Sequence, residues 1–354
     1  MSGEKIQRAI VGRRIKIGFV GCGRIFEKHL EAVRARSDEF EVAAVCDIDM
    51  NRLEAAKLAL ECDGYTSFSM MIEACELDIV ALCTPSGLHA EQTIQASEKQ
   101  IHVITEKPMA TSWSDGKRMV QACDTNGVKL FVVKQNRSNA PIQKLRKAIE
   151  RGMFGKIHMV VVNVFWHRPE AYYQSDAWRG TWEFDGGAFM NQASHYVDLL
   201  DWLIGPVESV QAFTGTLARN IEVEDTGAAI VRWRSGAIGS VNVTMLTYPN
   251  NYEGSITVIG ESGTAKVGGI AVNKIEHWEF EDKQNDLEAG DADYDTDSVY
   301  GFGHSSYYGN VVKVLRGVGT PDTDGREGLR SLELLIAIYR AARDGHKIPL
   351  PLDY

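Results

Sequence analysis

Two kinds of segment are missing from this sequence: long apolar runs and strongly basic regions. None of its 354 residues lies in an uninterrupted apolar run near the ~18 residues that a membrane-spanning helix needs. The formal net charge is −10, so no basic surface is expected to hold a nucleic-acid backbone. These absences exclude a membrane span, and neither a membrane nor a nucleic acid is expected as a partner.

Cysteine is present, but not in the spacing of a metal site or a disulfide framework. No two of the six cysteines are separated by two residues, and all lie within the first 123 residues: Cys22, Cys46, Cys62, Cys75, Cys83 and Cys123. The basic N-terminus carries no apolar segment of a secretory signal before the first strand-like pattern. We therefore expect a cytoplasmic protein with reduced thiols and no bound metal.

Negative charge is concentrated near the C-terminal end. Residues 279–297 contain nine Asp or Glu and one Lys, a net charge of −8. A run of this kind is typical of a solvated loop, although it can also form a functional surface. We interpret it as a loop.

The length predicts two domains, and the sequence pattern changes near residue 140. The first domain, 1–140, alternates short Val- and Ile-rich runs with helical segments, which predicts a parallel Rossmann sheet covered by helices. Its expected strands are Ile15–Val20, Val42–Cys46, Ile79–Cys83, Ile101–Thr105 and Leu130–Val133, with helices such as Asn51–Glu61 and Ser112–Asn126.

The second domain, 141–354, is predicted to be α+β with a large open, mostly antiparallel sheet. It begins with a helix at Pro141–Arg151, and one long helix, Ala188–Ile204, interrupts the strands. The final helix, 325–343, can belong to this domain or pack back on the first. The expected strands are Met159–Phe165, Val207–Leu217, Ala228–Trp233, Ala237–Thr247, Ser255–Ile259 and Ala265–Val267.

A glycine-rich turn follows the first predicted strand and opens a helix. In Gly21-Cys22-Gly23-Arg24-Ile25-Phe26, the first Gly suits a tight bend and the second lets backbone N–H groups approach a pyrophosphate. Phe26 stands where Gly or Ala is usual. Asp47 ends the second strand, where a carboxylate binds ribose hydroxyls and repels a 2′-phosphate. The pattern favours NAD over NADP.

A lysine stands where the ligands of open α/β sheets bind. Glu106-Lys107-Pro108 follows the fifth strand and Thr84-Pro85 follows the fourth, both at the carboxyl edge. A lysine partly removed from water, or beside a positively charged nicotinamide, has a lowered pKa and can accept the hydroxyl proton of an alcohol. Lys107 is our candidate general base.

The helix predicted from Ala188 would supply further groups. At 100° per residue, one stripe contains Asn191, His195, Asp198 and Trp202. His195 titrates near neutral pH and can act as an acid or a base, whereas Asn191 can only orient a substrate. A cluster of aromatic and Arg residues precedes this helix: Trp166-His167-Arg168, Tyr172-Tyr173 and Trp178-Arg179. Aromatic rings suit a sugar or a base and Arg suits a carboxylate or a phosphate, but the same residues can also cover a packed loop.

Taken together, these motifs resemble the Gfo/Idh/MocA family of NAD(P)-dependent oxidoreductases over nearly the whole chain. The matching stretches are Gly21–Phe26 with His29, Asp47-Ile48-Asp49, Thr84-Pro85 through His89, Glu106-Lys107-Pro108, Trp178-Arg179, Gly186-Gly187, Asn191 through His195 with Asp198, and the helix Leu329–Arg343. The resemblance implies that Lys107 and His195 are the catalytic pair. It also implies that the open sheet forms an oligomer, which we expect to be a homotetramer.

One difference from the usual family pattern narrows the resemblance to a subgroup of the family. Many members carry Asp-x-Gly-x-His where this chain has Asn191-Gln192-Ala193-Ser194-His195, so no carboxylate stands at that position. With 134–137 (Lys-Gln-Asn-Arg) and Tyr307-Tyr308, this variant is similar to the WlbA/WbpB subgroup. The resemblance implies NAD-dependent oxidation of the 3-hydroxyl of UDP-N-acetyl-D-glucosaminuronate to the 3-keto sugar, in bacterial surface-polysaccharide (O-antigen) biosynthesis.

On this basis we assign residues to two groups of contacts. The cofactor contacts are Gly21, Cys22, Gly23, Arg24, Ile25, Phe26, Asp47, Ile48, Arg52, Thr84, Pro85, His89, Glu106, Lys107, Gln135, Trp178 and Arg179. The substrate contacts are Lys107, Arg168, Tyr172, Asn191, Gln192, Ser194, His195 and Tyr307.

Three other functions stay open at this point. A dehydrogenase of inositol or free sugars would turn over without a UDP group. An NAD-dependent glycosidase would oxidise its sugar transiently and release no net NADH. A redox-sensing NAD-binding regulator would keep the glycine turn and Asp47 but would not need Lys107 and His195 together. The sequence also leaves open whether NADH leaves after each turnover.

Overall fold

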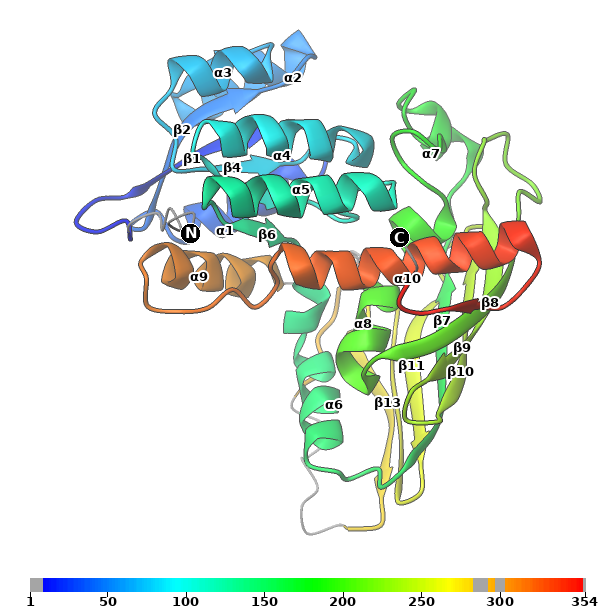
Figure 1. Cartoon of the computed structure of the whole chain (residues 1–354). Coiled ribbons are helices and arrows are strands. Elements are labelled where there is room, and N and C mark those ends of the chain that lie inside the picture. Colours follow the sequence, from blue (N-terminus) through cyan, green and yellow to red (C-terminus); the bar gives the residue numbers. More distant parts are fainter. Residues whose placement is uncertain (1–8, 283–291, 297–302, 353–354) are drawn as a thin grey trace. The chain divides into compact units, whose positions relative to one another are not determined.

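The computed structural model describes residues 9–282, 292–296 and 303–352, which fall into two compact units (Figure 1). The first unit takes in the chain up to Val133 together with His304–Leu329. The second takes in Lys134–Gly303 and the chain from Arg330 onward. The first boundary lies close to the expected one at residue 140. The return of 304–329 to the first unit was not expected from the sequence pattern.

The first unit is built on a six-stranded parallel sheet in the order β3-β2-β1-β4-β5-β6. This order is that of a Rossmann fold, so the predicted fold class is confirmed. β3 was missed because it has only three residues and no apolar run. The strands are β1 (Ile15–Val20), β2 (Phe40–Cys46), β3 (Asp63–Tyr65), β4 (Ile79–Leu82), β5 (His102–Thr105) and β6 (Leu130–Val132).

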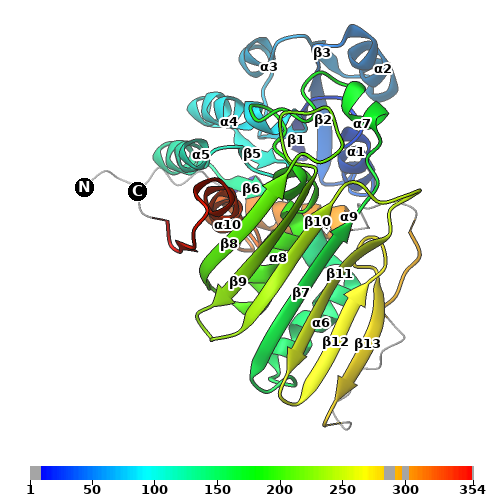
Figure 2. The same cartoon turned by 90° about the vertical axis from the view of Figure 1, so that its right-hand side faces the viewer.

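Helices cover both faces of this sheet, as Figure 2 shows. The apolar faces of α1, α2 and α9 share one core with the sheet, in which Phe19, Phe131 and Tyr308 are fully buried. The segment that returns to this unit therefore supplies part of its core. The helices are α1 (Phe26–Arg34), α2 (Met50–Leu60), α3 (Phe68–Ala74), α4 (His89–Glu98), α5 (Trp113–Asn126) and α9 (Gly303–Leu315), with short 3₁₀ turns at Ser86–Leu88 and, where the second unit begins, Gln135–Ser138.

The second unit is built on an eight-stranded sheet in the order β13-β12-β11-β7-β10-β9-β8-β14. Only the β7–β10 pair is parallel, which confirms a large, mostly antiparallel sheet. The strands are β7 (Ile157–Phe165), β8 (Val207–Gly215), β9 (Thr226–Trp233), β10 (Ile238–Thr244), β11 (Glu253–Gly260), β12 (Gly263–Gly268), β13 (Lys274–Phe280) and β14 (Ile348–Pro349).

One face of this sheet carries the helices and the other is turned toward the viewer in Figure 2. Buried and exposed residues alternate along β9 and β10, as expected for a sheet with one face packed on a core. The helices are α6 (Ala140–Glu150), α7 (Glu170–Gln174) and α8 (Ser194–Ile204), and α10 (Gly325–Asp344) begins in the first unit and continues in the second.

Three further features expected from the sequence concern the cysteines, membrane-spanning helices and the acidic run. All six cysteines are free thiols, as predicted. No helix in the described ranges is both long enough and apolar enough to cross a bilayer. Much of the acidic run at 279–297 lies outside the described residues, while Glu279 is the penultimate residue of β13.

The helix that follows the Lys107 segment has well-formed ends. Ser112 caps α5 by accepting a hydrogen bond from the Asp115 N–H at 3.1 Å, and its hydroxyl donates to the Asp115 carboxylate at 2.7 Å. Gly127 ends the helix at φ +67°, a conformation that glycine adopts without strain.

We expect Ser112→Ala to lower the free energy of unfolding by about 1 kcal/mol, because the replacement leaves a helix N–H group without its acceptor. Urea unfolding monitored by circular dichroism measures the change. Thr125→Ala, an exposed position near the other end of the same helix, is the matched control and should change stability by less than about 0.5 kcal/mol. Equal effects of the two substitutions would contradict the capping role.

Candidate active site

The glycine turn of the first unit has the backbone that a dinucleotide needs. Gly21 has φ +91°, and a Cβ there would lie 2.8 Å from the carbonyl oxygen of Cys83. By contrast, a Cβ at Gly23 would lie no closer than 3.8 Å to the nearest atom, in Arg52, so the backbone there is open to a ligand. The turn closes tightly at its first glycine and is accessible at its second, which fits pyrophosphate binding.

Asp47, at the end of β2, is fixed by two backbone N–H groups. Its Oδ2 accepts from the Cys22 N–H at 2.6 Å, and its Oδ1 accepts from the Asp49 N–H at 2.8 Å. The side chain is 8% exposed, whereas the neighbouring Ile48 is 91% exposed and offers an apolar surface beside it. This is the arrangement expected where a ribose and its base bind.

The other predicted cofactor contacts in this turn differ in their placement. Phe26 begins α1 and lies in the core, edge-on to Phe19 at 5.2 Å between ring centroids, so its side chain points away from the surface of the turn. Arg24 and Ile25 precede the helix. Arg52 lies on α2, with its Nε 3.6 Å from the Asp49 carboxylate.

A buried histidine joins the two loops at the ends of β4 and β5. His89 lies between the Thr84 carbonyl oxygen at 3.0 Å and the Pro108 carbonyl oxygen at 3.1 Å. Burial lowers the pKa of His89, although the carbonyl oxygens that face the ring oppose this shift. Thr84 also donates through its hydroxyl to Gln92 at 2.6 Å. We assigned His89 to the cofactor, and its observed contacts hold these two loops together.

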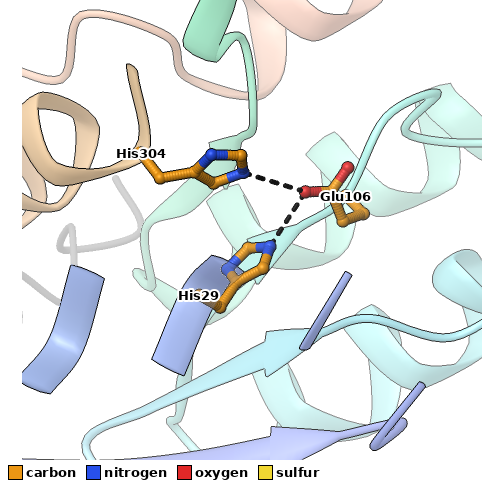
Figure 3. A group of neighbouring side chains, drawn as sticks. All are labelled: His29, Glu106 and His304. Carbon is orange, nitrogen blue, oxygen red and sulfur yellow. Dashed lines mark hydrogen bonds and ion pairs between the residues drawn. The ribbon is translucent and has the colours of Figure 1, made fainter. Parts of the chain in front are cut away.

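Glu106 points into the interior of the first unit, as Figure 3 shows. Its Oε1 lies 2.9 Å from His29 Nε2 and 3.9 Å from His304 Nε2, and its Oε2 accepts from the Lys107 N–H at 3.0 Å. Lys107 is only partly buried. The carboxylate of Glu106 thus holds the backbone of the residue that we assigned as the base.

Tyr307 was assigned to the substrate from its position in the sequence. The structure places it on α9 in the core of the first unit, where it is 6% exposed, and its hydroxyl has no hydrogen-bond partner within the described residues. The adjacent Tyr308 hydroxyl lies 2.7 Å from His29 Nδ1.

In the second unit, His195 lies beside a buried ionic cluster. Asp198 on α8 receives two hydrogen bonds from Arg137, at 2.8 and 2.7 Å, and Lys134 Nζ lies 3.5 Å away. Burial alone would raise the pKa of Asp198, but Lys134 and Arg137 outweigh it and hold that pKa below its ordinary value. Removing either cation would leave a buried charge poorly compensated.

The side chain of Gln135 lies against the ring of His195. Its amide group is 3.1 Å from His195 Nε2, in a hydrogen bond whose direction depends on the tautomer of the ring. The Gln135 side-chain oxygen is buried and has no partner in the described part of the chain.

The long helix expected from Ala188 is wrong in its first part. Residues Ala188–Gln192 form a π-helical turn, and α8 begins at Ser194. The 100° rotation per residue therefore does not hold between Asn191 and His195, so Asn191 leaves the predicted stripe, whereas His195, Asp198 and Trp202 keep their helical spacing in α8. Asn191 instead donates from its amide to the carboxylate of Asp185, which is buried. The sequence pattern did not predict that the Gly186-Gly187 turn and the π-helical turn after it would shift the helical register of the residues that follow.

A buried glutamate holds this π-helical turn in place. Glu224 Oε1 accepts from the Phe189 N–H at 2.9 Å and from the Tyr339 hydroxyl at 2.8 Å. A Cβ at Gly187 would lie 1.7 Å from Glu224 Oε2, so only glycine fits there. Burial raises the pKa of Glu224 to about 7. Glu224 and Tyr339 were not identified from the sequence, since single polar residues in a strand region and a helix carry no motif.

The predicted substrate loop forms a connected set of polar and aromatic contacts. Arg168 donates to Gln192 at 3.0 Å, Gln192 donates to the Tyr172 hydroxyl at 3.1 Å, and Arg179 donates to the same hydroxyl at 2.8 Å. The Arg179 guanidinium lies 4.3 Å from the ring centroid of Trp178 and 4.5 Å from that of Tyr172. Two guanidinium groups held by aromatic rings suit a carboxylate or a diphosphate. Ser194 lies apart from this set and donates to the Asn191 carbonyl at 3.2 Å.

Comparison with known proteins agrees with these features. Residues 15–134 match the Gfo/Idh/MocA model described as the NAD-binding Rossmann fold of an oxidoreductase family, and residues 146–350 match the C-terminal alpha/beta domain of the same family. Among curated proteins, D-apiose dehydrogenase of Paraburkholderia graminis is 27% identical over 358 residues, covering 96% of this chain and 90% of that one.

Two solved structures are much more similar. The WlbA dehydrogenase of Chromobacterium violaceum, in complex with NADH and UDP-GlcNAcA, is 59% identical with a TM-score of 0.94, covering 99% of this chain and 100% of that one. The WlbA dehydrogenase of Bordetella pertussis, bound to the same two ligands, is also 59% identical with a TM-score of 0.94, covering 97% and 100%. The chain therefore belongs to the Gfo/Idh/MocA family of oxidoreductases.

Proposed function

We propose that this protein oxidises the 3-hydroxyl of UDP-N-acetyl-D-glucosaminuronate to the 3-keto sugar with NAD, within bacterial surface-polysaccharide biosynthesis. The observation that carries the proposal is the 59% identity, over essentially the whole chain, to two dehydrogenases whose structures contain NADH and UDP-GlcNAcA. Bound NAD supplies a hydride acceptor. The residues of the first unit that would hold it are the glycine turn at 21–26, Asp47, Ile48 and the loops at 84–89 and 106–108.

Proton removal is left to the protein, and Lys107 is the residue proposed for it. In its neutral form the Lys107 amine accepts the hydroxyl proton as the C3 hydride departs, which balances the reaction as alcohol to ketone. His195, whose imidazole can act as an acid or a base near neutral pH, positions the substrate or relays a proton. Asn191, Gln192 and Ser194 orient the sugar.

The charge of the proposed substrate suits the Arg and aromatic contacts of the second unit. UDP-N-acetylglucosaminuronate carries a carboxylate and a diphosphate. Arg168 and Arg179 are each stacked on aromatic rings, and their fork geometry matches those anions. Arg179 also pairs with Asp176 at 3.0 Å, so a bound anion would share this guanidinium with that carboxylate.

Location in the cytoplasm and assembly as a homotetramer complete the proposal. Free thiols at all six cysteines fit a reducing compartment. The sheet of the second unit has exposed apolar side chains on several strands, which favours contact with another copy: Met159, Phe213, Ile230, Ile238 and Ile259.

The function is tested by incubating the purified protein with UDP-N-acetylglucosaminuronate and NAD. We expect the sugar nucleotide to lose two hydrogens by mass spectrometry, and NADH absorbance shows whether the reduced cofactor is released. UDP-N-acetylglucosamine, which lacks the carboxylate, is the matched control substrate. No mass change, with NAD bound, would reject this substrate, and turnover of inositol or D-apiose would redirect the assignment.

Replacing Lys107 tests the general base. We expect Lys107→Ala to lower kcat by about 10²- to 10⁴-fold with NAD affinity unchanged, because only proton transfer is lost. Lys107→Arg should be equally impaired, since a guanidinium stays protonated at neutral pH. Lys99→Ala, on the exposed surface after α4, serves as control. Full turnover by Lys107→Ala would assign the proton to another residue.

Replacing Asp47 tests the discrimination between cofactors. Asp47→Ser removes a carboxylate that would bind ribose hydroxyls and repel a 2′-phosphate. We expect NAD affinity to fall about tenfold, the loss of one or two hydrogen bonds to a charged group, while NADP affinity rises. Asp49→Ser keeps an N-cap residue on α2 and should leave the NAD-to-NADP preference unchanged. Fluorescence titration measures the Kd of each variant for NAD and for NADP. An unchanged NAD-to-NADP preference in Asp47→Ser would contradict the ribose contact.

A further inference from the structure

Three polar groups meet in the core of the first unit, away from water. His29 of α1 is 0% exposed, Glu106 after β5 is 5% exposed, and His304 of α9 is 4% exposed. Figure 3 shows the two imidazole rings turned toward one carboxylate oxygen. The His29 Nε2–Glu106 Oε1 distance of 2.9 Å is that of a hydrogen bond, whereas His304 Nε2, at 3.9 Å, has no hydrogen-bond partner in the described part of the chain.

The contacts of His29 indicate which group carries the positive charge. Both of its ring nitrogens are engaged, Nε2 by Glu106 and Nδ1 by the Tyr308 hydroxyl at 2.7 Å. Burial alone would lower the pKa of His29, but Cys83 and Glu106 outweigh it and raise that pKa. The pKa of Glu106 is held well below its usual range, chiefly because the hydrogen bond from His29 and the charge of that ring outweigh its burial. Burial lowers the pKa of His304.

Other titratable groups also face this cluster. Tyr307 and Tyr308 are buried phenols whose pKa values burial raises, so both stay neutral. Cys83 faces His29 from the end of β4 and, together with Glu106, raises the pKa of that ring. Lys28 adds positive charge near His304, which is a further reason for that ring to stay neutral.

Glu106 also connects the cluster to the proposed base. Its second oxygen accepts from the Lys107 N–H at 3.0 Å, so the carboxylate is tied to His29 on one side and to the backbone of Lys107 on the other. An uncompensated negative charge at Glu106 would favour the protonated form of the neighbouring Lys107 amine.

We propose that protonated His29 and ionised Glu106 form a buried, charge-balanced pair that positions Lys107 and keeps its amine uncharged for catalysis, with His304 as a neutral neighbour. His29 and Glu106 are positioning residues in this arrangement. The inference rests on the proposed function, because it assigns a role relative to Lys107 as the base.

The pH profile of kcat/KM gives a readout that a merely structural role would not change. Lys107 must be neutral to accept a proton, so its pKa sets the acidic limb. His29→Gln keeps a donor to Glu106 but removes the positive charge, and the acidic limb should move upward by about 1 pH unit. His304→Gln is the matched control, the same change at a neutral ring, and should leave the limb in place. An unshifted limb in His29→Gln would overturn the proposal.

A double variant distinguishes an electrostatic effect on the pKa of Lys107 from an effect of disrupted packing. His29→Gln with Glu106→Gln removes both charges, so the net charge beside Lys107 returns to zero. We expect the acidic limb to return to its wild-type position, although kcat can stay reduced through weaker positioning. A limb that remains shifted in the double variant would show that the displacement came from disrupted packing.

The charge states can also be read without catalysis. In protein labelled with ¹⁵N in its imidazoles, the signals lost in His29→Gln and His304→Gln identify the two rings. At pH 8 we expect both His29 nitrogens to be protonated and His304 to be neutral. A neutral His29 would overturn the proposal, and so would one equivalent of tightly bound zinc, because the candidate ligand atoms lie within 4.8 Å of one another. If the wild-type enzyme oxidised no UDP-sugar, the proposed function would fail while this spectrum still decided the charge pair.

Discussion

Burying a carboxylate away from water costs free energy unless hydrogen-bond donors or cations replace its hydration. This constraint explains the local contacts that hold the segments around the candidate residues. Asp47 is compensated by backbone N–H groups, which shapes the glycine turn. Glu106 is compensated by the His29 imidazole of α1, whose other nitrogen binds the Tyr308 hydroxyl of α9. Asp198 takes both Arg137 and a nearby lysine. Glu224 accepts hydrogen bonds from a backbone N–H and a tyrosine hydroxyl, and burial raises its pKa to about 7. The contacts of each of these carboxylates fix the position of a different loop or helix start.

Sequence reasoning predicted what depends on local chemistry. The buried strands, the tight bend at Gly21 and the lysine after β5 follow from short patterns, and the structure places them as expected. Contacts between distant segments were not accessible in this way. Nothing around His304 indicates that its ring faces Glu106, nearly two hundred positions earlier in the chain. The π-helical turn was missed for a related reason, because the close approach of Glu224 to Gly187 is a tertiary contact.

The candidate residues of the first unit and those of the second unit differ in how their side chains are held. In the first unit the polar groups bind mostly to backbone atoms at strand ends, so the fold of the sheet itself fixes them. In the second unit the guanidinium groups of Arg168 and Arg179 are held by rings and by side-chain amides. Planar groups stacked in this way lose less side-chain entropy when an anion binds, since their rotamers are already restricted. Selectivity among sugar nucleotides is therefore expected to depend on the guanidinium groups of the second unit.

The return of His304–Leu329 to the first unit has a consequence for how the protein is made. The segment 134–303 must leave the ribosome before α9 does, which takes roughly 10 to 35 s at ordinary rates of synthesis. During that time the face of the Rossmann sheet that α9 covers lacks part of its core. The nascent first unit thus presents an apolar surface that chaperones can bind. For the same reason a fragment ending at Val133 would not be an independent nucleotide-binding module, and a soluble version would have to carry α9 on a linker.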